Sequence, residues 1–292
     1  MKAPFTASEL ILTPAGAVYH LNLLPEQLAK KVILVGDPDR VAAVSNYFDQ
    51  IYYKVQHREF ITHTGRVGNT AITVVSTGIG TDNIDIVINE LDALVNINLI
   101  SRTEKSDHTS LQLLRLGTSG ALQKDIAVDS LLASSHGLGI DGLMPFYEAT
   151  ETEVTLKMLQ AIKSALPKLT EVAIPYLTAG SDLLLKQLVK TEMTGITLTS
   201  PGFYAPQGRE LRYKAKYRAL LEDAAAVVAD GHRITNFEME TAGIYGLAHL
   251  LGHEALSVNA IIANRPLGIF SNRPAASIDR MIRTMLERFT TS

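Results

Sequence analysis

Residues 236–241 read NFEMET and lead into a run of small residues, AGIYG, at 242–246. In an extended strand Glu238 and Glu240 would share a face, because side chains alternate along a strand. Two carboxylates on one face need solvent or hydrogen-bonding partners, such as a pair of sugar hydroxyls. An acidic helix start is the alternative, since the N-terminal helix dipole stabilises glutamate. A strand that passes into a helix is the unit from which we expect the fold to be built.

Short apolar runs alternate with amphipathic stretches on both sides of this segment, as is typical of an α/β fold. The run at 32–35 is followed by the turn GDPDR at 36–40 and then by helical spacing. Runs at 60–64 and 71–76 predict a hairpin. We also expect strands at 111–116, 130–135, 172–178 and 255–263, helices at 82–95, 151–166, 213–229, 273–289 and from 181, and a loop at 195–209.

Composition places the chain among globular proteins. Its 292 residues suffice for one large core, and no linker, repeat or composition shift marks a boundary, so we expect a single α/β domain over 1–292 with a central mixed sheet. A net charge of -3 gives no basic excess for a nucleic-acid partner. The absence of cysteine excludes disulfides, thiolate nucleophiles and cysteine-ligated zinc. Without a signal-peptide pattern or a membrane-spanning run, we expect a cytoplasmic protein without a membrane anchor.

Two groupings combine an arginine with glycines. Gly36 follows a strand and precedes Arg40, so the backbone can approach a ligand and the next helix can offer amides to an anion. Arg115 lies inside an apolar strand and is followed by GTSG at 117–120. Each grouping also has a structural explanation, an ordinary strand-to-helix turn and a structural ion pair respectively. Together their arginines, hydroxyls and flexible backbone amides favour a phosphate site without a metal cluster.

The loop at 203–209 holds a third grouping. Gln207 offers a donor and an acceptor and Arg209 offers donors, so the pair suits a planar amide-like edge with Phe203 stacked on its face. A solvated loop with a chance aromatic residue is the alternative. His20, and the pair His57 and Arg58 before a strand, are ambiguous in the same way.

Seven motifs follow one another along most of the chain: VYHLNL at 18–23, GDPDR at 36–40, HREF at 57–60, STGIG at 76–80, RLGTSG at 115–120, FYAPQGR at 203–209 and FEMET at 237–241. In this order they resemble the uridine phosphorylases of the nucleoside phosphorylase superfamily. The resemblance implies a single-domain α/β fold with a mixed, partly barrel-like sheet flanked by helices. It also implies homodimers with shared active sites, commonly assembled into a hexamer.

The resemblance further implies a pentosyltransferase that cleaves the N-glycosidic bond of uridine, or of deoxyuridine or thymidine, reversibly with phosphate. Nucleoside and phosphate are then its partners, and no metal or cofactor is implied. The resemblance assigns phosphate binding to Gly36, Arg40, Arg115 and Thr118, with Arg58 reaching across a dimer interface. It assigns ribose binding to Glu238, Met239 and Glu240, with His20 crossing over to the 5'-hydroxyl. It assigns base binding to Phe203, Gln207 and Arg209.

The implied mechanism follows charge development. Phosphate attacks C1' as the glycosidic bond breaks, and the sugar becomes cationic while the base leaves with negative charge on its carbonyl oxygens. Gln207 and Arg209 would stabilise the base, and Glu240 with the phosphate dianion would favour the cationic sugar. No side-chain nucleophile is required, because phosphate is the nucleophile and the protein positions it.

The sequence departs from relatives of the family at several points. Purine phosphorylases carry an aspartate after the final strand to protonate N7, whereas this chain has ANR at 263–265, which supports a pyrimidine base. Glu59 matches the glutamate of an interfacial monovalent cation site, but Asn83 stands where the family has serine, so that match is incomplete. The polar insertion at 101–110 and the extra length before residue 20 have no functional interpretation.

Three other functions stay open. A purine phosphorylase or a nucleosidase would share the fold and the EME sequence at 238–240, but Gln207 and Arg209 argue against both. An inactive nucleoside-binding protein on the same scaffold is disfavoured because the polar positions of all three groupings are present.

Overall fold

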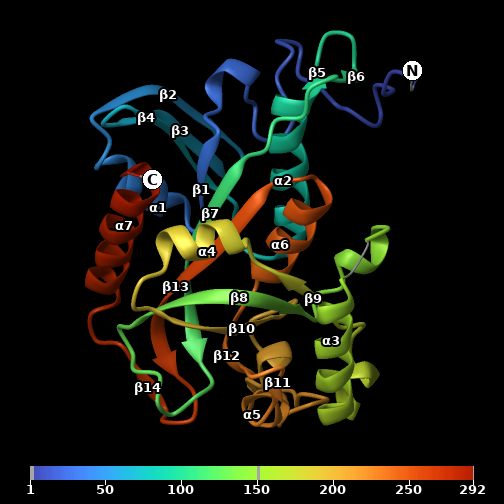
Figure 1. Cartoon of the computed structure of the whole chain (residues 1–292), viewed down its shortest axis with the longest axis vertical. Coiled ribbons are helices and arrows are strands. Elements are labelled where there is room, and N and C mark those ends of the chain that lie inside the picture. The colour runs from blue at the N-terminus through green and yellow to red at the C-terminus, as the bar shows by residue number, and fades with distance from the viewer. Residues whose placement is uncertain (1–2, 150–151, 292) are drawn as a thin grey trace.

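The computed structural model describes residues 3–149 and 152–291, which form an α/β fold around one large mixed sheet (Figure 1). The expected fold class is thereby confirmed. The strands are β1 Lys31–Val35, β2 Gln50–His57, β3 Phe60–Val67, β4 Thr70–Ser76, β7 Gln112–Ala121, β8 Leu131–Gly139, β9 Tyr176–Ala179, β10 Met193–Thr199, β11 Val228–Ala229, β12 His232–Glu238, β13 Glu254–Asn264 and β14 Ile269–Phe270, while β5 Ile97–Asn98 and β6 Thr103–Glu104 form a separate hairpin.

Helices flank the sheet on both faces. They are α1 Pro38–Ser45, α2 Thr81–Asn96, α3 Glu153–Ala165, α4 Asp182–Leu188, α5 Leu220–Ala225, α6 Thr241–Leu250 and α7 Pro274–Thr291, with short 3-10 turns at Pro25–Gln27, Met144–Phe146, Pro167–Glu171 and Ala205–Gln207. Within the described residues, no helix is both long enough and apolar enough to cross a membrane.

Five strands close into a barrel. β7 pairs with β13, β13 with β8, β8 with β10 and β10 with β12, and the antiparallel pairing of β12 with β7 completes the ring. Closure leaves no free edge among these strands and buries their side chains from both directions. The barrel-like sheet implied by the family resemblance is therefore present.

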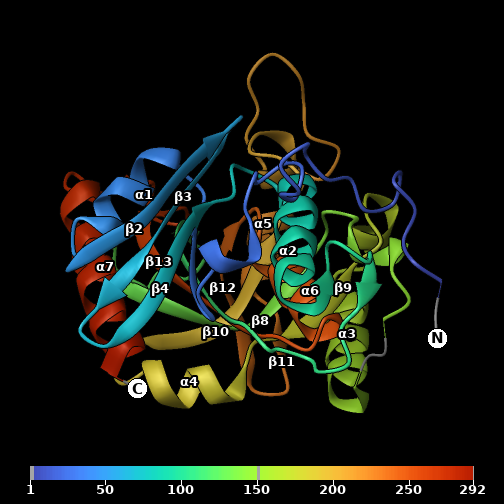
Figure 2. The same ribbon diagram turned by 90° about the horizontal axis from the view of Figure 1, so that it is seen from above.

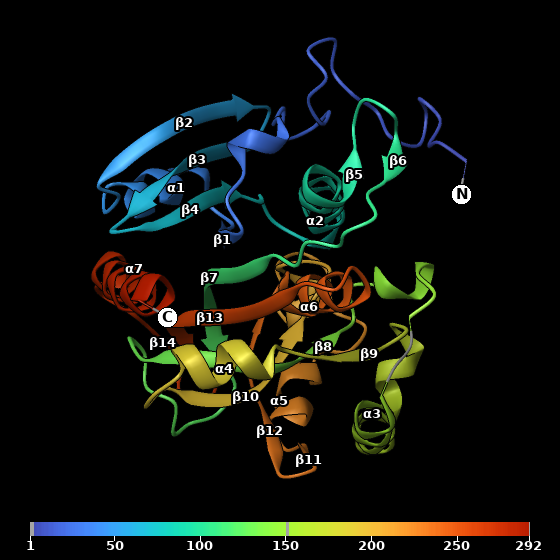
Figure 3. The same ribbon diagram turned by 45° about the horizontal axis from the view of Figure 1, so that its top comes forward.

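The sheet continues from the barrel through β1, β4, β3 and β2, and β1 runs parallel to both β7 and β4. Helix α1 packs on β3 and β4, whereas α4 and α7 pack on β13 and on each other, and Val41, Leu188 and Phe289 of these helices belong to one apolar core cluster. Helices α2 and α6 pack together in another cluster (Figure 3). Parallel strands bring their carboxyl ends to one edge, which is where the polar motifs lie.

Local sequence encodes several helix starts. Asp37 caps α1, since its Oδ1 accepts a hydrogen bond of 3.0 Å from the Asp39 amide, and Pro38 occupies the first helical position. Ser181 caps α4 through a bond of 3.1 Å from the Leu184 amide to its Oγ. These caps explain why the boundaries at 36–40 and at 181 were predictable from sequence.

The predicted loop at 195–209 is wrong in its first part. Residues 193–199 form β10, which pairs in parallel with both β8 and β12 and is buried from Gly195 onward. A strand that is buried on both faces lacks the alternation of polar and apolar residues by which a strand is identified in a sequence. Without that alternation, the glycine and threonines of β10 favour the prediction of a loop. The irregular segment begins at residue 200, and the connection to α5 projects from the body of the protein (Figure 2).

Other boundaries also differ from expectation. The helix expected at 213–229 is limited to α5, because residues 211–218 are mostly exposed and irregular. The strand expected at 172–178 begins only at Tyr176, after a 3-10 turn at Pro167–Glu171. The predicted helix at 151–166 is α3, and residue 151 lies outside the described residues. The sequence interpretation missed β2, whose QIYYKVQH is largely exposed and lacks clear alternation.

The insertion at 101–110 and the chain before residue 20 pack against each other. Arg102 donates hydrogen bonds to the carbonyl oxygens of Phe5 and Thr6, each at 3.0 Å, and also to that of Leu10. The Phe5 amide returns a bond of 2.8 Å to the Arg102 carbonyl. The N-terminal segment thus lies beside the β5–β6 hairpin in both Figure 1 and Figure 3.

Candidate active site

A pocket of about 970 Å³ opens where β1, β7 and β12 end. It brings together most of the residues that the sequence motifs single out. The lining residues include Gly36, Arg40, Arg115 and Thr118 from the first two groupings, Phe203, Gln207 and Arg209 from the loop, and Glu238, Met239 and Glu240 from NFEMET. Four motifs that are distant in sequence therefore line a single space.

Antiparallel pairing of β12 with β7 carries the glutamates to the arginine. Phe237 lies opposite Gly120, so the chain after Phe237 runs back along β7 toward Arg115. β12 ends at Glu238, and Glu240 takes the N-cap position of α6 with φ -139° and ψ -30°. The two glutamates are consequently not strand neighbours on one face, yet their carboxylates converge on the same guanidinium.

Arg115 is 5% exposed and fully engaged. Its Nη2 lies 3.1 Å from Oε2 of Glu238 and also pairs with Glu240, while Nη1 donates a bond of 2.9 Å to Oδ1 of Asn259. The guanidinium folds back over Gly117, where a Cβ atom would lie 1.8 Å from Nη1. Glycine two residues after the arginine is therefore required by the packing of the ion pair.

Glu238 and Glu240 have different environments. Glu238 accepts from the amides of Glu240, at 2.9 Å, and Thr241, at 3.0 Å, and from Oγ1 of Thr199, at 2.7 Å, so it stabilises the start of α6. Glu240 accepts a bond of 2.8 Å from the Gly80 amide through Oε1. The helix-start interpretation of the acidic pair is thus supported for Glu238, and Glu240 is the carboxylate better suited to a ligand.

The charges in this cluster do not balance. Burial disfavours the charge of Arg115, but the nearby Glu238 and Glu240 outweigh that effect and raise the pKa of the guanidinium. Burial raises the pKa of Glu240, Glu238 acts in the same direction, and Arg115 opposes both. Two buried carboxylates share one arginine, so the site readily accepts hydroxyl donors or a neighbouring positive charge.

Arg40 lies in the first turn of α1 beside this cluster. Its Nη1 donates a bond of 3.3 Å to the Leu116 carbonyl, and it forms no ion pair with any described residue. Burial lowers the pKa of Arg40, Asp37 opposes this effect, and Arg115 reinforces it. A partly desolvated cation without a carboxylate partner favours an anion at this end of the pocket.

The backbone amides of 117–120 are less available than the sequence indicated. Residues 117–120 continue β7, pairing with β13 and, at Gly120, also with β12, and are not a flexible loop. Thr118 is only partly buried and lines the pocket, so its hydroxyl rather than free amides is what this motif offers. The prediction of flexible amides is corrected on this point.

Phe203, Gln207 and Arg209 form one unit in the lining of the pocket. The Arg209 guanidinium lies 3.7 Å from the centre of the Phe203 ring, and its Nη1 donates to the Phe203 carbonyl at 2.6 Å and to Oε1 of Gln207. Gln207 is 2% exposed. Burial lowers the pKa of Arg209, and the charge of nearby Arg265 acts in the same direction. The unit presents amide and guanidinium groups beside an aromatic face.

His20 and Arg58 do not line the pocket of their own chain. The Tyr19 ring lies 5.0 Å from the His20 ring and 5.4 Å from the Arg58 guanidinium, so both residues gather on Tyr19. Glu59, next to Arg58, does line the pocket, as does Asn83. Arg58 is thus next in sequence to a pocket residue, and His20 lies near it through Tyr19.

Two pocket contacts were missed from sequence. The Gly80 amide binds Glu240, and Asn259 of β13 binds Arg115. An asparagine within the mostly apolar run ALSVNAIIA at 255–263 is the signal that could have identified Asn259. The Gly80 contact has no comparable signal, since a backbone amide leaves no trace in composition.

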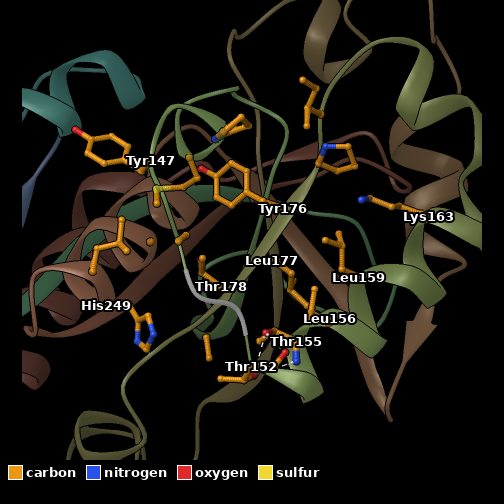
Figure 4. A pocket seen from close by; sticks show the side chains of 18 residues that line it. Tyr147, Thr152, Thr155, Leu156, Leu159, Lys163, Tyr176, Leu177, Thr178 and His249 are labelled. Atoms are coloured by element: carbon orange, nitrogen blue, oxygen red, sulfur yellow. Dashed lines mark hydrogen bonds between the residues drawn. The ribbon is translucent and has the colours of Figure 1, made fainter.

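A second pocket, of about 390 Å³, lies away from these residues (Figure 4). Its lining contains none of the residues that the motifs single out. The side chains labelled in Figure 4 are largely apolar or hydroxyl-bearing, with Lys163 and His249 as the basic groups. This combination offers neither a carboxylate pair nor an arginine cluster.

Asp92, His108 and His253 place potential metal-ligand atoms within 4.8 Å of one another. The Leu111 amide donates a bond of 3.2 Å to Nδ1 of His253, so the proton of a neutral ring resides on Nε2, facing Asp92 at 3.3 Å. A metal at Nε2 would have to displace that proton. The geometry therefore favours a polar cluster that fastens the segment around His108 over a metal centre.

Residues 30–287 match the sequence profile of the phosphorylase superfamily, a span that contains nearly all of the pocket and the sheet. The chain belongs to the phosphorylase superfamily. Among curated members, uridine phosphorylase of Thermococcus kodakarensis is 30% identical over 268 residues, which cover 91% of this chain and 84% of that protein. Uridine phosphorylase of Escherichia coli K12 is 27% identical over 260 residues, covering 85% and 86%.

A solved structure of the superfamily shares the fold. The Trypanosoma brucei nucleoside phosphorylase, described as showing uridine phosphorylase activity, superimposes with a TM-score of 0.87 at 25% identity, covering 97% of this chain and 100% of that one. The similarity extends over the whole sheet and its helices. The resemblance inferred from seven short motifs is therefore confirmed by comparison along nearly the full chain.

Proposed function

We propose that this phosphorylase superfamily member cleaves the N-glycosidic bond of uridine with phosphate, reversibly, to give uracil and ribose 1-phosphate. The observation that carries the proposal is a single pocket whose lining includes Arg40, Arg115, Glu240, Gln207 and Arg209. Relatives that span most of the chain are named uridine phosphorylase, which agrees with this assignment.

Phosphate occupies the end near Arg40 in this proposal. Arg40 supplies a cation that has no carboxylate partner among the described residues, Thr118 supplies a hydroxyl, and Gly36 lines the same pocket. Arg115 is already paired with two glutamates, so it contributes one edge of the site rather than a free charge. Phosphate thereby lies beside Glu240, where the sugar must be.

Ribose then lies against Met239 and Glu240. The carboxylate of Glu240 is held by Arg115 and the Gly80 amide and accepts from a sugar hydroxyl. As the glycosidic bond breaks, positive charge develops at C1' between the phosphate dianion and Glu240, and both stabilise it. Glu238 acts indirectly, because its hydrogen bonds fix the start of α6 and hence the position of Glu240.

The base lies against Phe203, with Gln207 and Arg209 at its polar edge. Negative charge develops on the carbonyl oxygens of uracil as it leaves, and the Arg209 guanidinium stabilises that charge. A purine would need an acid at N7, but the corresponding stretch of this chain, residues 263–265, reads ANR and holds no acid. The base end therefore favours a pyrimidine over the purine alternative.

The site is completed by a second copy of the chain in this proposal. Arg58 and His20 lie together on Tyr19 and outside their own pocket, as expected of groups that act across a dimer interface. Arg58 would reach phosphate and His20 the ribose 5'-hydroxyl of the partner subunit. Higher assembly into a hexamer is part of the same proposal.

Ultraviolet absorbance of uridine with and without phosphate tests the reaction. We expect uracil release that depends strictly on phosphate. Release without phosphate would identify a nucleosidase, and a lack of release from uridine, deoxyuridine and thymidine, with binding retained, would identify a nucleoside-binding protein.

Hybrids of two inactive chains test the shared site. Arg58→Ala and Arg209→Ala remove groups that the proposal places in the same site but takes from different subunits. Mixing and reassembling the two variants should restore part of the activity, because some sites then hold neither substitution. Properly reassembled hybrids that stay inactive contradict the cross-subunit assignment.

A further inference from the structure

One carboxylate on α2 holds both the backbone and the ring of His20. Oε1 of Glu90 lies 2.9 Å from the His20 amide and 2.7 Å from Nδ1 of its ring, and Oε2 accepts a bond of 2.8 Å from the Leu21 amide. Most of the Glu90 side chain is buried, with 15% exposed, whereas 27% of the His20 side chain is exposed. Glu90 thus anchors the segment and leaves part of the imidazole accessible.

This contact determines which ring nitrogen carries the proton. An ionised carboxylate only accepts hydrogen bonds, so Nδ1 of His20 must donate to Glu90. In the neutral ring Nε2 then keeps its lone pair and can accept a hydrogen bond. Glu90 therefore selects the tautomer in which the free nitrogen is an acceptor.

Further contacts fix the position of the ring from other sides. Nδ1 of His57 donates a bond of 3.0 Å to the His20 carbonyl, and the Tyr19 ring meets the His20 ring edge-on at 5.0 Å. Arg58 lies over the same Tyr19 ring. His20 is consequently held on the same surface as Arg58, the other group that we place across the interface.

We propose that Glu90 is a positioning residue, which holds His20 so that Nε2 accepts a hydrogen bond from the ribose 5'-hydroxyl in the site of the partner subunit. This inference rests on the proposed function and deepens it, since it specifies that the 5'-hydroxyl must act as the donor. Substrates that lack a donor at the 5' position lose this interaction. A neutral hydrogen bond of this kind corresponds to about a tenfold preference.

The test compares kcat/KM for uridine, 5'-deoxyuridine and 5'-fluoro-5'-deoxyuridine, whose fluorine cannot donate. We expect the wild-type enzyme to favour uridine about tenfold over both analogues. In Glu90→Gln only one of the two terminal atoms still accepts, so either the Leu21 amide or the His20 amide and Nδ1 together lose their acceptor. The ring is then no longer held in one tautomer and position, and the preference should fall toward unity. Activity on 5'-deoxyuridine should change little.

Further variants separate positioning from folding. Glu90→Ala leaves amides unpaired and is expected to lose stability, so Glu90→Gln carries the argument. Asp85→Asn removes the same charge from α2, but Asp85 binds Tyr147 and Asn89 rather than His20, so it should keep the uridine preference. Nitrogen-15 shifts of the His20 ring should report a proton on Nδ1 in the wild type.

The outcomes distinguish the inference from the function. A Glu90→Gln enzyme that keeps the full preference for uridine overturns the inference alone, as does one that loses activity equally on all three substrates. A wild-type enzyme without phosphorolysis of any of them overturns the proposed function as well. Loss of the preference in Glu90→Gln, with Asp85→Asn unchanged, supports the positioning role.

Discussion

Nη2 of Arg115 lies 3.1 Å from Oε2 of Glu238 in the interior of the protein, although the two residues lie on strands from opposite halves of the sequence. The same guanidinium also pairs with Glu240, so one cation stabilises two buried carboxylates. An ion pair of this kind is costly to break from one side, because the remaining charge stays buried without a partner.

Replacing Arg115 with methionine is therefore expected to lower the free energy of unfolding by about 3–5 kcal/mol and to abolish activity. Chemical denaturation monitored by circular dichroism gives the change in stability. Adding Glu238→Gln to Arg115→Met removes one of the stranded charges and should recover part of the loss. Equal stability of Arg115→Met and wild type would contradict the buried ion-pair assignment.

Alanine at position 117 should displace the same guanidinium. Its Cβ would lie 1.8 Å from Nη1 of Arg115 and 2.7 Å from Oδ1 of Asn259, so we expect Gly117→Ala to cost about 1–3 kcal/mol of stability. A double-mutant cycle with Arg115→Ala provides the control. The cost of Gly117→Ala should fall in that background to what the contact with Asn259 leaves, and an unchanged cost would show that the contact with Arg115 is not its cause.

Removal of Arg209 should affect turnover more than folding. Its guanidinium is only partly buried and stacks on the exposed Phe203, so its loss leaves no buried charge. Arg209→Ala is expected to lower kcat/KM for uridine by about 10²- to 10³-fold with little change in melting temperature. Arg212→Ala, in an exposed part of the same segment, should retain activity, and a similar loss there would indicate a general effect on the loop.

His136 should make stability depend on pH. Burial lowers its pKa to about 4, and the nearby charge of His232 adds to the effect. The unfolded chain, with a histidine pKa of about 6.5, binds a proton that the folded protein does not, so stability should rise with pH between about 4 and 6.5 and level off above.

Replacing His136 with glutamine removes this contribution. As pH falls from 7 to 4.5, the free energy of unfolding of the wild type should decrease by about 1–2 kcal/mol more than that of His136→Gln. This figure allows for the partial exposure of His136. Denaturant midpoints measured across this range provide the test. His249→Gln alters an exposed histidine and serves as the control, and parallel pH profiles of His136→Gln and wild type would refute the assignment.

Arg102 should control the order of the N-terminal segment. Arg102→Ala removes donors to the carbonyls of Phe5, Thr6 and Leu10, so limited proteolysis within the first seventeen residues should become faster. Arg102→Lys keeps the charge but supplies a single nitrogen, and it should give an intermediate rate. Proteolysis at the wild-type rate in both variants would mean that other contacts hold the segment.

Sequence alone predicted the elements whose signals are local. The hairpin of β3 and β4, the turn into α1 and the amphipathic α7 lie where spacing and turn residues placed them. The errors fall where tertiary contacts override local pattern. β10 resembles a loop until it is buried between β8 and β12, and residues 211–218 have helical spacing without a surface to pack against.

The candidate site shows the same division between local and tertiary information. Motifs identified Arg40, Arg115, Gln207, Arg209 and Glu240, because each is a polar residue in a context that needs explanation. The contacts of Glu240 with the Gly80 amide and of Arg115 with Asn259 were not predictable. Neither partner lies near its contact in sequence, and a backbone amide has no residue type to signal it.

The sequence by itself determined the order of strand, turn and helix units, the polar groups at their ends and, through seven motifs, the family. Only the tertiary structure decided that the two glutamates of NFEMET separate into a helix-start acceptor, Glu238, and a pocket carboxylate, Glu240. The physical reason is that β12 meets β7 by hydrogen bonds between distant parts of the chain. Burial and charge at Arg115 arise from that pairing, and no local pattern of residues encodes it.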